Sequence, residues 1–118
     1  MRLAPALPVV LGLLALAAPP AAAQDTLLSP GSLLQGCEGL VNNAPGGSDL
    51  QTGACAGSVD TALAIGQSIG RVCMPADGNV VSAARVVVNY IYEQTGRRSQ
   101  RFGLVALEAL QVRWPCPR

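Results

Sequence analysis

Histidine and lysine are absent from the 118-residue chain, and aromatic residues make up only 3% of it. Without histidine, a Ser-His-Asp triad, a Cys-His nucleophile and a histidine-ligated metal site are all excluded. Charged residues are few as well, at 13%, and they balance to a formal net charge of +1. Nucleic-acid binding normally needs a strong excess of basic side chains. The composition therefore argues against an enzyme and against a nucleic-acid-binding protein, and it indicates no cofactor.

The first 23 residues differ from the rest of the chain. A single cation, Arg2, precedes an apolar run from about Leu7 to Ala18, and small residues follow at Ala21 and Ala23. This order is typical of a secretory signal peptide cleaved before residue 24. The apolar run is shorter than the roughly 20 residues that a membrane span requires. We therefore predict a signal peptide over residues 1–23 and no stable membrane anchoring.

The remaining residues, 24–118, form one small exported domain with equal numbers of basic and acidic side chains. A core of this size gives a thin margin of stability, so cross-links are useful. Four cysteines in an exported chain predict two disulfides, formed by Cys37, Cys55, Cys73 and Cys116. Zinc sites and redox motifs need closely paired cysteines, whereas the gaps here are 18, 18 and 43 residues. A metal site is therefore disfavoured.

The spacing of apolar residues predicts four helices, over residues 32–41, 54–72, 83–95 and 100–113, with no convincing strand. Ser32, Ser82 and Ser99 are the expected N-caps, and Gly96 occupies the position of a glycine that ends a helix. Residues 42–53, rich in Asn, Gly and Ser, predict a loop. The fold class is therefore all-α, a small four-helix domain with two disulfides.

Glycine is frequent in the predicted helix over residues 54–72. Gly57, Gly66 and Gly70 lie within it, and each glycine in a helix costs about 1 kcal/mol relative to alanine. Close approach of a neighbouring helix would compensate that cost. We therefore expect another helix to pack against these glycines.

The order of the helices favours one pairing of the cysteines. The last two helices are joined by a short connection near Gly96, so they should run antiparallel. The end of the last helix then returns to the turn that carries Cys73, which favours Cys73–Cys116 and leaves Cys37–Cys55. The nested alternative, Cys37–Cys116 with Cys55–Cys73, stays open at this point.

An ordered set of short motifs resembles a known family. The motifs are Gly31-x-x-Leu34-x-x-Cys37, Cys55-Ala56-Gly57, Cys73-Met74-Pro75, Tyr90-Ile91, Ala109-Leu110 and Trp114-Pro115-Cys116. Together they resemble the Rap/Tai-type immunity proteins, small all-α periplasmic proteins of Gram-negative bacteria. The resemblance implies a protein that binds and inhibits a peptidoglycan amidase effector of type VI secretion, often as a homodimer. The alternative is a periplasmic chaperone-like stress protein without a toxin partner.

A binding role requires an exposed recognition surface. The candidates are Asp49, in the predicted loop, and the basic cluster Arg97, Arg98 and Arg101 before the last helix. Arginine binds carboxylates in a bidentate manner and is enriched at interfaces. Trp114, in contrast, is expected to lie in the core beside the Cys73–Cys116 disulfide.

Overall fold

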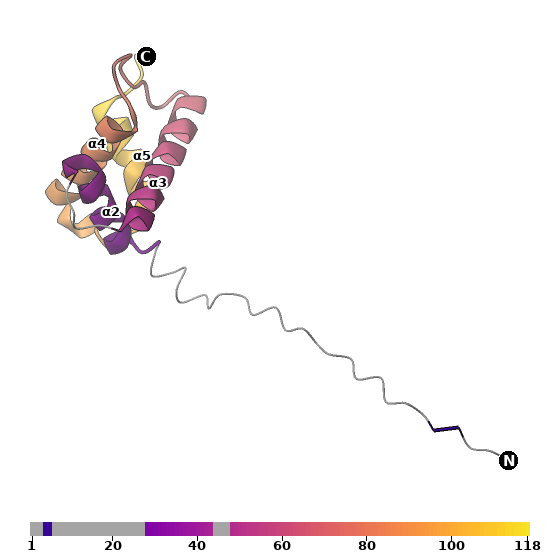
Figure 1. Cartoon of the computed structure of the whole chain (residues 1–118). Coiled ribbons are helices and arrows are strands. Elements are labelled where there is room, and N and C mark those ends of the chain that lie inside the picture. The colour runs from indigo at the N-terminus through magenta and orange to yellow at the C-terminus, as the bar shows by residue number, and fades with distance from the viewer. Residues whose placement is uncertain (1–3, 6–27, 44–47) are drawn as a thin grey trace.

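Four α-helices make up the domain in the computed structural model, which describes residues 4–5, 28–43 and 48–118. They are α2 (Pro30–Asn42), α3 (Asp49–Ser68), α4 (Val80–Glu93) and α5 (Phe102–Arg113), with a short 3₁₀ helix, η1 (Thr95–Arg97), before α5 (Figure 1). Across these ranges the extended pairing is a single isolated β-bridge between Val72 and Pro115. The predicted all-α four-helix domain with two disulfides is confirmed. The predicted cleavage site before residue 24 lies outside the described residues.

The helix N-termini differ from the sequence prediction because other residues provide the caps. In α2 the cap is Ser29, whose hydroxyl accepts a hydrogen bond from the Ser32 N–H at 3.2 Å, so the predicted cap at Ser32 is wrong. Pro30 takes the first position of the helix, where its missing N–H costs nothing. The helix therefore begins two residues earlier than expected.

Helix α3 begins at Asp49, within the segment predicted to be a loop. Ser48 and Gln51 form a capping box, in which each side chain accepts a hydrogen bond from the other residue's backbone N–H. The box satisfies two of the N–H groups that a helix start leaves unpaired. The predicted loop over residues 42–53 was therefore too long.

Caps also differ around α4 and α5. Asn79, not Ser82, caps α4, and Ser82 is its partner in a second capping box. Gly96 lies within η1 and ends no helix. Helix α5 has Arg101 at its N-cap position and no side-chain cap, so the predicted cap at Ser99 is wrong as well.

The three glycines of the second predicted helix have three different roles. Gly70 has a φ of +70° and ends α3, because the Arg71 N–H bonds the Gly66 carbonyl and the Gly70 N–H bonds the Gln67 carbonyl. This is a Schellman motif, and its left-handed residue is ordinarily glycine. A Cβ at Gly66 would lie 2.4 Å from the Val72 side chain and 3.1 Å from that of Leu107 in α5, so the expected close approach occurs there.

Gly57 departs from that expectation. A Cβ there would meet no atom of another described element within 4 Å, so no described helix packs against it. The close approach of α2 and α3 occurs instead at Gly36, where a Cβ would lie 2.1 Å from the Gln51 carbonyl oxygen. The glycine spacing thus predicted close contacts but did not place all of them.

Two disulfides cross-link the domain. Cys37 is bonded to Cys55, and Cys73 to Cys116, as the helix order favoured. The first links α2 to α3 and is fully buried. The second brings the C-terminal end of the chain next to the segment that follows α3 (Figure 1). Trp114 is buried, and its carbonyl accepts a hydrogen bond from the Cys73 N–H at 2.8 Å, so its expected place in the core is confirmed.

Candidate functional site

The three arginines of the predicted basic cluster have separate surroundings. The Arg97 guanidinium lies 2.6 Å from the Glu108 carboxylate of α5 and donates a second bond to the Gln100 side chain at 2.8 Å. The pair is about one-third exposed, so its contribution to stability is small. Its geometric effect is to hold η1 against α5. Arg97 is thus engaged within the domain.

Arg98 belongs to a contact between three elements. Its guanidinium carbon lies 5.1 Å from the centre of the Tyr92 ring in α4, which is a cation–π distance. The Tyr92 hydroxyl in turn donates a hydrogen bond to the Glu38 carboxylate of α2. That hydrogen bond is the main reason why the pKa of Tyr92 is raised above its ordinary value. Arg98, Tyr92 and Glu38 therefore form a polar link at the surface that joins α2, α4 and the residue directly after η1.

Arg101 differs from the other two. Its backbone carbonyl accepts the first hydrogen bonds of α5, from Leu104 and Val105. Its side chain is exposed, and no ion pair or hydrogen bond of its guanidinium occurs within residues 28–43 and 48–118. Arg101 is thus available to a group outside the domain.

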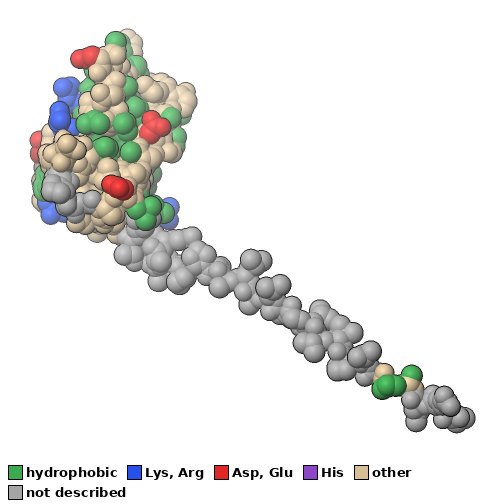
Figure 2. Space-filling view, viewed as in Figure 1, with side chains coloured by type: hydrophobic (Ala, Val, Ile, Leu, Met, Phe, Trp, Pro, Cys, Tyr) green, Lys and Arg blue, Asp and Glu red, His purple; other side chains and the backbone are tan. Residues whose placement is uncertain are grey.

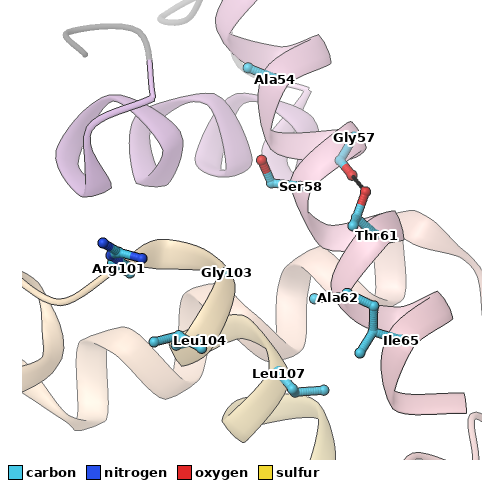
Figure 3. Close-up of a pocket in the computed structure, with 10 residues that line it drawn as sticks. All are labelled: Ala54, Gly57, Ser58, Thr61, Ala62, Ile65, Arg101, Gly103, Leu104 and Leu107. Carbon is cyan, nitrogen blue, oxygen red and sulfur yellow. Dashed lines mark hydrogen bonds between the residues drawn. The ribbon is translucent and has the colours of Figure 1, made fainter. Parts of the chain in front are cut away.

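A groove lies beside Arg101, between α3 and α5. Its volume is about 780 Å³. The described residues that line it are Ala54, Gly57, Ser58, Thr61, Ala62, Ile65, Arg101, Gly103, Leu104 and Leu107 (Figure 3). Arg101 and Gly103 lie on the α5 side where the two helices are further apart, and Leu107 and Ile65 lie near each other further along (Figure 3). Of the described residues that line the groove, Arg101 alone is charged.

The groove is lined mainly by apolar side chains and by glycines, which have no side chain. Ile65 is 48% exposed and Leu104 is 65% exposed, although both are large hydrophobic side chains. At Gly57 and Gly103 a Cβ would meet nothing within 4 Å, so the helix backbones themselves form part of the surface. The Thr61 hydroxyl donates to the Gly57 carbonyl at 2.8 Å, which satisfies its polar group within α3. The groove is therefore an open apolar surface with one cation at its side.

Asp49, the remaining predicted site residue, shares no described interaction with the arginines. It is exposed in the first turn of α3, directly after the Ser48 cap. A negative charge at this position interacts favourably with the helix dipole. In the part of the chain that the structure describes, no ion pair joins Asp49 to an arginine. The structure therefore does not unite Asp49 and the arginines in one site.

The surface around these residues mixes apolar and charged groups. Figure 2 shows hydrophobic side chains exposed on one face of the helical domain, with acidic and basic side chains at separate points around them. The described ranges contain no group of three or more His, Cys, Asp or Glu residues that could hold a metal ion. They also contain no helix with the length and apolar character needed to cross a membrane.

These features define a small disulfide-linked helical protein with exposed apolar surface, and the comparison with known families agrees with that class. The family model of the Rap1a immunity proteins matches residues 29–116, which include all four helices and all four cysteines. The chain therefore belongs to the Rap1a immunity protein family, as the sequence motifs indicated. No curated protein and no solved structure matches the chain. The family indicates an immunity protein directed against a secreted effector.

Sequence reasoning did not find the groove. Two features of the sequence belong to the groove. One is a glycine inside a helix, Gly57, and the other is a pair of large apolar residues outside the buried helix faces, Ile65 and Leu104. These features become interpretable only when α3 and α5 are known to lie side by side.

Proposed function

We propose that this protein is a periplasmic immunity protein that binds and inhibits a secreted peptidoglycan amidase, without catalysis of its own. The observation that carries the proposal is the family match over residues 29–116, which spans the whole helical domain. Immunity proteins act by occupying the effector, so the expected chemistry is protein binding. The exposed apolar groove with Arg101 at its side supports a protein partner.

The periplasmic location rests on the first 23 residues and on the disulfides. We propose that residues 1–23 are removed as a signal peptide and that residues 24–118 form the immunity domain. Two disulfides suit an oxidising compartment such as the periplasm. N-terminal sequencing of the protein recovered from a periplasmic fraction should begin at Gln24. A first residue of Met1 would contradict export by this route.

The binding proposal is tested by co-production in the periplasm of a Gram-negative host. The genes beside the one for this chain are first searched for a peptidoglycan amidase. The amidase found there is the partner, and an inactive variant of it is the toxicity control. We expect the amidase alone to lyse cells, and co-production of this chain to restore growth. The purified pair should elute as one complex on size exclusion, and peptidoglycan cleavage in vitro should fall in proportion to the immunity protein added.

Other outcomes of the same experiment would contradict the proposal. Cells that lyse at the same rate with and without this chain, together with separate elution of the two proteins, would refute the amidase as partner. Inhibition without a stable complex would point to turnover and would contradict a purely binding role. Suppression of heat- or acid-induced aggregation of unrelated proteins, in place of protection, would support the chaperone-like alternative.

A further inference from the structure

The α3–α5 groove has no occupant within the described chain, although it is large and apolar. Its volume is about 780 Å³, and Ile65 and Leu104 remain half to two-thirds exposed on its walls. Apolar side chains that are scattered singly on a surface need no explanation, but a continuous apolar groove marks a site of interaction. The groove also lies apart from the Arg98–Tyr92–Glu38 link, whose side chains already interact with one another.

The shape of the groove favours a helix as its occupant. Helices α3 and α5 lie side by side and form the two walls of the groove, and an amphipathic helix can bury its apolar face in an apolar groove of this kind. Gly57 and Gly103 lower the walls at the Arg101 end, so the backbone of an incoming helix can approach closely. At the other end, Ile65 and Leu107 offer side chains to an apolar ridge (Figure 3).

The charge of the groove specifies the occupant further. Arg101 is its charged residue, and no described carboxylate neutralises the guanidinium. Arginine recognises a carboxylate through paired, charge-assisted hydrogen bonds. The complementary helix therefore carries an Asp or Glu that faces the Arg101 end and an apolar ridge that faces Ile65 and Leu107.

We propose that the α3–α5 groove is the docking site for an amphipathic helix of the effector, with an effector carboxylate bound by Arg101. This inference rests on the proposed immunity function and specifies the surface that carries it. It also separates the three arginines of the basic cluster: Arg101 contacts the partner, whereas Arg97 and Arg98 are held by groups of the same chain.

Two substitutions and two matched controls test the groove. Gly57→Leu fills the groove with a side chain, while Gly53→Leu places the same side chain on the same helix outside the groove; a Cβ meets nothing within 4 Å at either position. Arg101→Glu reverses the charge at the groove, and Arg85→Glu does so at an exposed position on α4. A glutamate at the start of α5 suits the helix dipole, so Arg101→Glu should fold normally. Thermal unfolding of each variant confirms that it folds.

The measurement is the Kd of each purified variant for the amidase used above, by calorimetry at constant salt. We expect Gly57→Leu and Arg101→Glu to weaken binding at least tenfold, and Gly53→Leu and Arg85→Glu to stay within threefold of the wild type. Wild-type binding with unchanged affinity in both groove variants would overturn the groove and leave the proposed function intact. Absence of wild-type binding would overturn the proposed function and, with it, the groove as an effector site. A change of oligomeric state in the groove variants alone, without amidase, would assign the groove to a second copy of this chain and overturn the proposal.

Discussion

Replacing glycine by alanine should have opposite effects at two positions of this domain. In a helix interior, alanine is favoured over glycine by about 1 kcal/mol because glycine loses more backbone freedom on folding. Gly57 offers that gain without a cost, since a Cβ there meets nothing within 4 Å. We expect Gly57→Ala to raise the free energy of unfolding by roughly 0.5–1 kcal/mol.

Gly36 presents the opposite case. A Cβ at this position would lie 2.1 Å from the carbonyl oxygen of Gln51 and 2.5 Å from its carbonyl carbon, both of which are backbone atoms of α3. Ordinary contact begins at 3.4 Å, so α2 and α3 would have to separate by more than 1 Å. The neighbouring Cys37–Cys55 disulfide, with 5.2 Å between its Cα atoms, resists that separation. Overpacking costs about 1–3 kcal/mol, and a clash with backbone atoms belongs at the upper end of that range. After the gain in helix propensity is subtracted, a net loss of about 1–2 kcal/mol is expected.

The assay is thermal and urea unfolding followed by far-ultraviolet circular dichroism, with both disulfides intact. One kcal/mol corresponds to a shift in Tm of about 4–8 °C for a domain of this size. Gly36→Ala should therefore lower the Tm by about 4–15 °C, while Gly57→Ala should raise it by several degrees. Equal Tm values for the two variants, or a more stable Gly36→Ala protein, would refute the assignment of Gly36 as the contact point between α2 and α3.

Three further predictions concern the Cys37–Cys55 disulfide, the Ser48 cap and the Tyr92 hydrogen bond. Replacing both Cys37 and Cys55 by alanine should lower the free energy of unfolding by about 3 kcal/mol, given the 18-residue separation, and a loss below about 1 kcal/mol in urea unfolding would contradict this. Ser48→Ala removes the α3 cap and should cost about 1 kcal/mol, so an unchanged Tm would show that the capping box is dispensable. Because the folded pKa of Tyr92 lies above its ordinary value of 10.0, the bond to Glu38 stabilises the fold below pH 10, and that stability is lost as the pH rises through the folded pKa. In Tyr92→Phe, stability should therefore fall less steeply above pH 10 than in the wild type; identical pH profiles would argue against the bond.

The existence of the four helices followed from local pattern alone. Apolar residues at helical spacing predicted each of them, and the observed cores of α4 and α5 use Val87, Ile91, Val105 and Leu110, among others. Their starting points were harder to predict, since several residues in each connection can act as caps. Ser29 and Ser48 are the caps because their hydroxyls lie within hydrogen-bond distance of the N–H groups of Ser32 and Gln51, and composition does not reveal those positions.

The candidate site was predicted less completely. Arg97, Arg98 and Arg101 form a single cluster in the sequence, but a run of charges does not show which carboxylate or ring each side chain will contact. Glu108 is 11 residues from Arg97, and Glu38 is 54 residues from Tyr92. Such partners are brought together by helix packing, so the roles of the arginines were not accessible from spacing.

Helix periodicity and short motifs are local properties, and they sufficed for the fold class and the family, whereas the cysteine positions favoured the observed pairing without excluding the nested one. The sequence favoured that pairing because a short connection makes α4 and α5 run antiparallel, which returns Cys116 to Cys73. Tertiary structure alone separated Gly36, which lies against the α3 backbone, from Gly57, which opens onto a groove. The two glycines look alike in the sequence, because the role of a residue without a side chain depends entirely on what packs against it.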